Sequence, residues 1–403
     1  MERIAKPRLI RKINEKIILN CIRNEAVVTK TRLFELTNIS KQTINNIIKS
    51  LINRKLVIKI GFGESTNEGG KRPLLLKYNP DAYFLIGGML GLKYIRFGIT
   101  NLNGEIIIEK KIETKKESPP EIIINNIIKL IKDTIKESEV DFNRVLGIGI
   151  GVPGVVDFEK GLIEILPLFN NWYNIPLKDI IEKEFKIPVI LDNENRMRAI
   201  GEKWFGLAKN VKNFITIITG DGIGACVVIG DNVIRGKNNI CGEIGHMKLK
   251  LDGPLCACGA KGCFESLINT ERFNEFLKEN VNNHSYGESL LLDTYKKNGR
   301  VSHEEVFRYY NKKDKLAEKI VENIIYWFGI GISNLICCYD PELIILHGIY
   351  IELNDHFFNS LNNIIDQNIF PKIKKDIKIV KTEIGKEIGI IGAASIILDN
   401  YDL

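Results

Sequence analysis

The sequence predicts a two-lobed α/β body preceded by a small basic domain of three helices and two strands. The first observation is charge, because residues 1–80 carry 17 Lys and Arg against 6 Asp and Glu, whereas the rest of the chain carries 40 against 44. The second is that apolar residues recur at helical spacing as far as Asn53. The third is that strand and helix patterns alternate from Phe84 onward, which is the order of an α/β protein.

Length and composition limit the class of protein. At about 150 residues per domain, a chain of 403 residues accommodates two or three domains. No apolar run approaches the roughly 18 residues that cross a bilayer, and no apolar segment follows the basic N-terminus. We therefore expect a cytoplasmic protein that does not bind membranes. Eight cysteines are too few and too unevenly spaced for a secreted disulfide scaffold.

The basic domain begins with two predicted helices. The first covers residues 10–24 and has one apolar stripe made of Ile10, Ile13, Ile17, Ile18 and Cys21. Thr29 is a suitable N-cap for the second helix, which carries Leu33 and Leu36. Asn38 suits the left-handed turn that ends it.

The third predicted helix, capped by Ser40 and ending near Asn53, has the composition of a DNA-reading helix. Its buried face follows the i, i+3, i+4, i+7 spacing of Ile44, Ile47, Ile48 and Leu51. Its outward face carries Lys41, Gln42, Thr43, Asn45, Asn46 and Lys49. Amide side chains can read adenine in a major groove, and Lys can contact guanine or phosphate. An ordinary solvated helix face has the same composition.

The segment after this helix favours DNA binding. The second and third predicted helices and their short turn are followed by a strand at Leu56–Ile60, a glycine-rich stretch at Gly61–Gly70 and a strand at Leu74–Tyr78. This order predicts a winged helix-turn-helix domain. Lys71 and Arg72 at the end of the wing are candidates for contact with phosphate or the minor groove, and a solvated charged turn is the alternative.

The body is expected to contain two cycles of strands and helices with a cleft between the lobes. The first has strands at Leu85–Met89, Ile95–Thr100, Glu105–Lys110 and Val145–Val152 and a helix at Glu121–Glu137. The second has strands at Val189–Leu191 and Leu343–Leu346, a hairpin at Phe214–Ile229, and helices at Arg198–Trp204, Lys315–Cys338 and Gly389–Leu398. The expected domains are 1–80, 81–190 completed by the C-terminal helix 389–403, and 191–388.

One cluster in the second lobe has the residue types of a metal site. Three thiols, from Cys256, Cys258 and Cys263, lie within eight positions, and His246 precedes them. One imidazole and three thiolates form a tetrahedral site for zinc, and the site is expected to be structural because protein ligands fill all four positions. A redox site is the alternative for three thiols in a reducing compartment.

A longer motif surrounds this cluster. Gly242-Glu243-Ile244-Gly245-His246 precedes Cys256-Ala257-Cys258-Gly259-Ala260-Lys261-Gly262-Cys263-Phe264-Glu265. With these residues the body resembles the ROK family of sugar kinases and repressors over residues 82–400. The order of basic domain and body resembles the repressor branch, such as the xylose and N-acetylglucosamine repressors. The resemblance implies an actin-like, ribonuclease H-like body of the sugar-kinase kind.

The resemblance also implies which residues contact a sugar. In this sequence the matching residues are Gly154, Asn193, Glu194, Glu243, His246 and Glu265. Carboxylates and amides suit adjacent sugar hydroxyls, and a metal-held imidazole presents its other nitrogen in a fixed direction. Each Asn or Glu taken alone is equally compatible with a surface residue or a helix cap.

The phosphate loops of the kinases are altered. Where the kinases have Asp-x-Gly-Gly-Thr, this sequence has Met89-Leu90-Gly91-Leu92-Lys93, and where they have Gly-Thr-Gly it has Gly220-Asp221-Gly222-Ile223-Gly224. The first loop loses the carboxylate that helps to organise the metal and nucleotide, and the second gains a negative charge beside the phosphate position. Glu194 stands where the kinases have a catalytic Asp, which alone decides nothing because Glu also accepts a proton.

The favoured hypothesis is a sugar-responsive transcriptional repressor of carbohydrate-utilisation genes, not an enzyme. It would bind operator DNA as a homodimer or larger oligomer and a monosaccharide in the cleft, with zinc as its cofactor. The first alternative is an active sugar kinase that carries a DNA-binding domain, and the second is an interaction module that binds a protein partner in place of a sugar.

Overall fold

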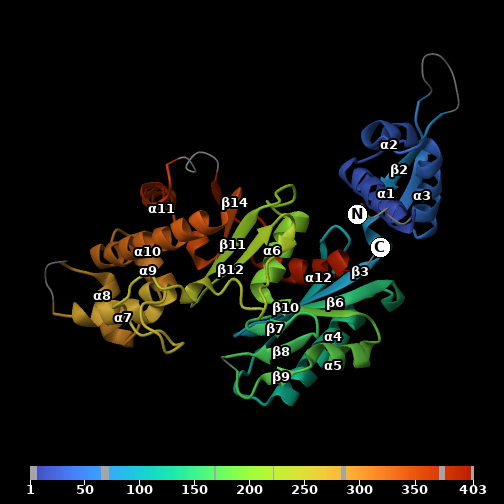
Figure 1. Cartoon of the computed structure of the whole chain (residues 1–403). Helices are drawn as coiled ribbons and strands as arrows, with labels where there is room; N and C mark the ends of the chain where they lie inside the picture. The colour runs from blue at the N-terminus through green and yellow to red at the C-terminus, as the bar shows by residue number, and fades with distance from the viewer. Residues whose placement is uncertain are drawn as a thin grey trace. The chain divides into compact units, whose positions relative to one another are not determined.

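The structure is a computed structural model that describes residues 7–64, 72–167, 169–220, 222–282, 287–371 and 377–400 (Figure 1). The chain divides into two compact units. The first is built around residues 1–84 with two short additions, 100–105 and 140–146, and the second contains the rest of the chain.

Three helices and a two-stranded sheet form the part of the first unit that we call the head. They are α1 (Pro7–Asn24), α2 (Lys30–Thr37), α3 (Lys41–Asn53), β1 (Val57–Phe62) and β2 (Leu74–Tyr78). β1 pairs antiparallel with β2, with Val57 opposite Tyr78 and Phe62 opposite Leu74. This is the order of three helices and two strands that the sequence predicts for the head.

The caps expected for α2 and α3 are present. The Thr29 side chain accepts a hydrogen bond from the Arg32 backbone N–H, and Asn38 ends α2 in the left-handed conformation with φ of 54°. The Ser40 side chain accepts from the Thr43 backbone N–H at the start of α3. The apolar face of α3 is buried, as predicted, through Ile44, Ile47, Ile48 and Leu51.

The apolar stripe predicted for α1 is only partly buried. Ile18 is buried, and its partner in the core is Ile22, one turn further along. Ile10, Ile13 and Ile17 are 40–49% exposed. The two sets lie on adjacent sides of the helix, and periodicity alone does not say which of two apolar sides faces the core.

The first sheet of the body has the strand order β10-β6-β3-β4-β5. Its strands are β3 (Phe84–Leu90), β4 (Tyr94–Asn101), β5 (Ile106–Glu113), β6 (Val145–Val152) and β10 (Val189–Asn193). The helices α4 (Pro120–Ser138) and α5 (Leu177–Phe185) lie on one face and α12 (Ile388–Asn400) on the other (Figure 1). A small antiparallel sheet, β7 (Val155–Asp157), β8 (Leu162–Ile165) and β9 (Tyr173–Ile175), follows β6.

Glycines allow α12 to pack closely against its neighbours. A Cβ on Gly149 of β6 would lie 1.7 Å from the Ala393 carbonyl oxygen, and one on Gly392 would lie 1.8 Å from the Met197 carbonyl oxygen. The C-terminal helix therefore contacts both the first sheet and α6 (Glu194–Phe205), the helix that begins at a predicted sugar-binding residue.

The second sheet has the order β13-β12-β11-β14-β15. Its strands are β11 (Phe214–Thr219), β12 (Ile223–Ile229), β13 (Asn232–Val233), β14 (Leu343–Gly348) and β15 (Lys378–Lys381). The helices of this lobe are α7 (Thr270–Glu279), α8 (Leu290–Asn298), α9 (His303–Tyr310), α10 (Lys315–Tyr339) and α11 (Asp355–Asn368). Short 3₁₀ helices occur at Pro80–Ala82, Phe142–Arg144, Ile244–His246, Glu265–Leu267, Ile349–Glu352 and Gly385–Glu387.

The helix α10 is long and apolar enough, by length and composition, to cross a membrane. Within its most apolar stretch, 61% of the residues are buried inside the protein. Phe328 and Ile332 of α10 are fully buried in the core of the second lobe. This is the behaviour of a core helix.

Candidate functional sites

The polar face of α3 is partly used by contacts within the head. The hydroxyls of Ser40 and Thr43 lie 2.9 Å apart, so both belong to the helix cap. Lys30 Nζ of α2 donates to Asn45 Oδ1 at 2.7 Å. Lys41 Nζ lies 5.5 Å from the centre of the Phe34 ring. These candidates therefore have a structural role whether or not they also contact DNA.

The remaining α3 candidates, Gln42, Asn46 and Lys49, are exposed. Their spacing of four and three residues places them on one side of the helix. Arg72 is also exposed, at the end of the wing, whereas Lys71 lies outside the described residues. Long, exposed amide and cationic side chains on one helix face are the groups that can reach base edges and phosphates.

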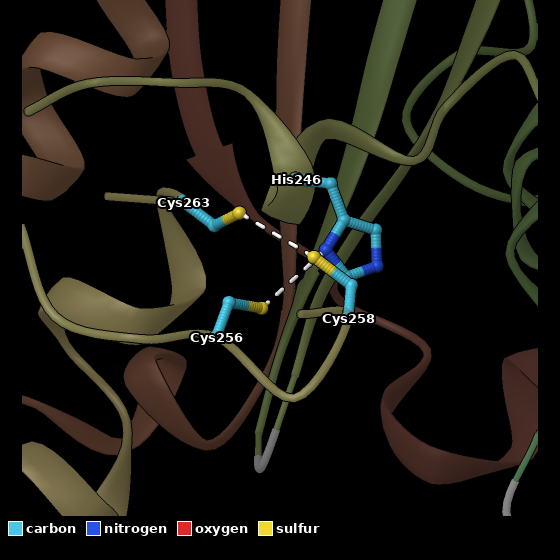
Figure 2. Close-up of side chains that lie close together, drawn as sticks. All are labelled: His246, Cys256, Cys258 and Cys263. Carbon is cyan, nitrogen blue, oxygen red and sulfur yellow. Dashed lines mark hydrogen bonds between the residues drawn. The ribbon is translucent and has the colours of Figure 1, made fainter. Parts of the chain in front are cut away.

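The structure brings the four predicted metal ligands together. The ligand atoms of His246, Cys256, Cys258 and Cys263 all lie within 4.8 Å of one another (Figure 2). Cys256 Sγ is 3.7 Å from His246 Nδ1, and Cys258 Sγ is 3.7 Å from Cys263 Sγ. Zinc–sulfur bonds of about 2.3 Å give a tetrahedron whose edges are close to 3.8 Å. The donor set and its spacing therefore fit a tetrahedral metal ion.

The chemistry of the thiols fits the same conclusion. Burial raises the pKa of the Cys256 thiol to about 12, and the nearby carboxylate of Glu265 adds to the shift. A thiol with a raised pKa stays protonated until a bound cation displaces the proton, so metal binding at Cys256 releases a proton. Gly262 lets the loop close, because a Cβ there would lie 1.5 Å from the Lys250 carbonyl oxygen.

Two of the predicted sugar-binding residues are joined directly. Asn193 Nδ2 donates to the Gly154 carbonyl oxygen at 3.0 Å, and Asn193 Oδ1 accepts from the Asn195 backbone N–H at 2.8 Å. Asn193 is thus the N-cap of α6 and fixes the direction of that helix. Gly154 is required as glycine, since a Cβ would lie 2.3 Å from the Ile165 carbonyl oxygen.

Of the other four predicted sugar-binding residues, Glu243 and Glu265 lie near His246, and Glu194 lies near enough to Glu243 to affect the pKa of its carboxyl. His246 Nδ1 lies 3.6 Å from Glu265 Oε1, which also accepts from Cys256 Sγ at 3.2 Å. Burial raises the pKa of the Glu243 carboxyl, the charge of His246 opposes that shift, and the carboxylates of Glu265 and Glu194 add to it. Because Nδ1 faces the thiols, Nε2 is the imidazole nitrogen that can meet a ligand (Figure 2).

The segment that we matched to the first phosphate loop of the kinases begins in the core, at Met89 and Leu90, and ends at the exposed Lys93. Met89 is buried in β3, and its sulfur would lie 2.7 Å from a Cβ on Gly151 of β6. The Gly91 backbone N–H donates to the Tyr94 carbonyl oxygen at 3.0 Å, so this amide is already used by the turn. In the second loop, Asp221 lies outside the described residues, and Gly224 packs against the Asn195 side chain.

Sequence reasoning missed two features near these residues. The Asn195 side-chain oxygen is buried and has no hydrogen-bond partner among the described residues, which makes it a further candidate for a ligand hydroxyl. Asp192 is fully buried and is bound by Arg196 and Arg235. The four-residue separation of Asp192 and Arg196 is no reliable signal, because the i, i+4 rule applies within a helix and Asp192 lies on a strand.

Comparison with known proteins extends over the whole chain. Residues 86–400 match the ROK family. The xylose repressor of Bacillus spizizenii is 30% identical over 398 residues, which are 99% of this chain and 98% of that protein. A glucokinase of Halalkalibacterium halodurans is 29% identical over 308 residues, which are 76% of this chain and 92% of that enzyme.

The fold is also that of a solved protein. A ROK family transcriptional regulator, described as a homologue of the E. coli MLC protein, superposes with a TM-score of 0.83 at 24% identity. The match covers 98% of this chain and 97% of that protein, so it includes head and body. The body of this chain thus has the actin-like fold of ROK regulators and kinases, and the chain belongs to the ROK family.

Proposed function

We propose that this chain is a sugar-responsive transcriptional repressor of carbohydrate-utilisation genes. Operator DNA binds α3 and the wing, a monosaccharide binds the body, and sugar binding lowers the affinity for DNA. The observation that carries the proposal is that one chain combines a basic head exposing Gln42, Asn46 and Lys49 with a carboxylate group around His246. The similarity to a xylose repressor along 99% of the chain supports it.

The sugar-binding set is Gly154, Asn193, Glu194, Glu243, His246 and Glu265. The carboxylates of Glu194, Glu243 and Glu265 accept hydrogen bonds from sugar hydroxyls. Glu243 is an exposed residue, which gives the sugar access. Asn193 acts by fixing α6 and the Gly154 turn, because its side-chain amide is already occupied. The domain limits 1–80, 81–190 with 389–403, and 191–388 assign DNA binding to the first domain, Gly154 to the second and the other five sugar-binding residues to the third.

Zinc is the proposed metal at His246, Cys256, Cys258 and Cys263. When bound, it supplies a fixed tetrahedral anchor and no reactive position, since the protein fills all four sites. His246 uses Nδ1 for the metal and directs Nε2 to the sugar. Glu265 lies beside both Cys256 and His246, so a change at the metal also moves a sugar-binding carboxylate.

The DNA target follows from symmetry. A homodimer presents two α3 helices to successive major grooves, so the operator is an inverted repeat with half-sites about 10 bp, or a multiple of it, apart. Lys71 and Arg72 contact phosphate or the minor groove beside each half-site. We assign the protein to the cytoplasm, where it meets both operator DNA and sugar without a membrane.

The experiment is a gel-shift titration of the operator at one salt concentration, with and without sugar. The sugar is chosen from a monosaccharide panel that includes D-xylose and D-glucose, as the one that stabilises the folded protein most. A ligand at about 100 times its Kd adds about 2.7 kcal/mol to the free energy of unfolding. A coupling of about 1–3 kcal/mol weakens DNA binding about 5- to 150-fold. Identical affinities reject the sensor, and tighter binding with sugar keeps the sensor but reverses its sign.

The competing function is a sugar kinase, which the similarity to a glucokinase over 76% of the chain favours. We propose that the chain is not an enzyme, because Met89 fills the place of a metal-organising carboxylate and the Gly91 amide is used by its turn. Sugar-dependent ADP production at about 1 per second or faster, an ordinary enzyme rate, contradicts this.

A further inference from the structure

A buried carboxylate with two arginines lies beside the sugar-binding set. Asp192, at the end of β10, is fully buried. Its Oδ1 accepts from Arg196 of α6 at 2.8 Å, and its Oδ2 accepts from Arg235 through Nε at 3.0 Å and through a terminal nitrogen at 2.8 Å. Such paired, charge-assisted bonds fix geometry as well as adding energy.

The Arg235 guanidinium connects three sheets. Arg235 follows β13 of the second sheet, and Asp192 belongs to β10 of the first. The guanidinium also lies 3.8 Å from the centre of the ring of Phe158, which directly follows β7 of the small sheet. One side chain thus holds segments that are far apart in the sequence.

Arg196 holds the loop that leads to the metal motif. One of its terminal nitrogens donates to the Asn239 carbonyl oxygen at 2.6 Å and to the Cys241 carbonyl oxygen at 3.4 Å. Gly242 and Glu243 follow at once in the chain. The two arginines therefore fix both ends of the segment 235–241, one at its start and the other near its end.

Stability alone does not explain this cluster. Burying the Asp192 carboxylate with the Arg196 guanidinium carries a large desolvation penalty, and apolar residues of similar volume often replace such groups without loss. A fixed arrangement of charged donors is better suited to setting the register between segments. The segments in question carry the sugar-binding residues, since Asn193 and Glu194 follow Asp192, and Glu243 and His246 follow Cys241.

We propose that Asp192, Arg196 and Arg235 form a clamp that sets the spacing between the two halves of the sugar-binding set. One half is Asn193 with Glu194, and the other is Glu243 with His246. The three clamp residues are positioning residues, because none is assigned a contact with the sugar. The functional part of this proposal rests on the proposed sugar binding, whereas the holding of segment 235–241 does not.

The test replaces Arg235 in the full-length protein, because Arg196 then remains to balance the buried Asp192. Arg235→Met removes the charge and keeps an apolar stem, and Arg235→Lys restores a single charged donor. Arg96→Met is the matched control, since Arg96 also binds a carboxylate, that of Glu109, through two nitrogens. The side chains of Arg96 and Arg235 are both 24% exposed.

Two measurements decide the outcome. Hydrogen exchange of the amides in residues 236–246 is expected to be at least tenfold faster in Arg235→Met, and unchanged in Arg96→Met. The Kd for D-xylose or D-glucose, whichever binds the wild type more tightly, is expected to rise at least tenfold in Arg235→Met. Arg235→Lys is expected to recover part of both, because it restores one charged donor to Asp192.

Unchanged exchange in residues 236–246 overturns the clamp. Faster exchange with a wild-type sugar Kd overturns its role in positioning the sugar-binding residues. If the wild type binds neither sugar, the proposed sugar binding fails for these two probes, and the exchange measurement still decides whether the clamp holds the segment.

Discussion

Replacing Cys263 by Ser is predicted to release the metal and loosen the sugar site. Cys263 is fully buried, and its Sγ lies 3.7 Å from Cys258 Sγ. The change therefore removes a buried thiolate from the metal cluster. Zinc present at about 1,000 times its Kd contributes about 4 kcal/mol to the free energy of unfolding. At about 2–4 °C per kcal/mol, its loss lowers the melting temperature by about 8–16 °C.

The assay combines metal analysis with melting. Wild-type protein purified without added zinc is expected to hold about one zinc per chain, since four protein ligands close the site, and Cys263→Ser is expected to hold almost none. Cys337→Ser is the control, because Cys337 is exposed and lies outside the cluster. A metal-free protein that melts with the wild type, or that binds sugar with the same Kd, refutes the argument that the metal holds His246 in place.

Two further predictions concern the head and a buried histidine. Asn46→Ala is expected to lower the affinity for operator DNA about 5- to 150-fold at one base position and so relax sequence preference. Arg72→Ala is expected to weaken binding to all sequences alike and to reduce the slope of log affinity against log salt concentration by about 1. The reverse pattern in a gel-shift series contradicts the assignment. Burial lowers the pKa of His347 to about 3, and the charge of Arg198 adds to the shift. The unfolded chain binds this proton from about pH 6.5 downward, so the free energy of unfolding falls by up to about 1.4 kcal/mol per pH unit on acidification. Urea titrations at pH 6.5 and 4.5 are expected to show a smaller fall in the free energy of unfolding for His347→Gln than for the wild type. An equal fall rejects this role of His347.

The sequence predicted most where local chemistry and periodicity agree. In α3, the Ser40 cap and the four apolar positions at helical spacing determine both the start and the buried face, and the structure confirms them. The metal cluster was equally accessible, because thiols close in sequence can converge only within a tight loop, and glycines at 259 and 262 adopt the positive φ that this loop needs.

What the sequence could not supply depends on contacts between distant residues. The buried side of α1 is decided by its packing in the head, and the apolar stripe of the sequence does not show that Ile13 and Ile17 are exposed. The bond from Lys30 to Asn45 joins two helices, and only the structure shows that this predicted DNA contact is already engaged. The clamp around Asp192 draws its two arginines from segments 39 residues apart in sequence, 196 and 235, and no spacing pattern pairs them.

Met89 is the residue that we matched to the carboxylate of the kinase phosphate loop, and it is buried, so replacing it by Asp alone is not expected to create such a loop. Met89 is 5% exposed and packs against Gly151 of β6 and Gly389 of α12. Met89→Asp places a carboxylate among these groups, and an uncompensated buried charge destabilises on the order of 3–5 kcal/mol, whereas Met89→Leu costs less than about 1.5 kcal/mol. Urea unfolding of the two variants and their sugar-dependent ADP production test the argument. Equal stabilities, or ADP production by Met89→Asp, would show that space for the kinase carboxylate remains open.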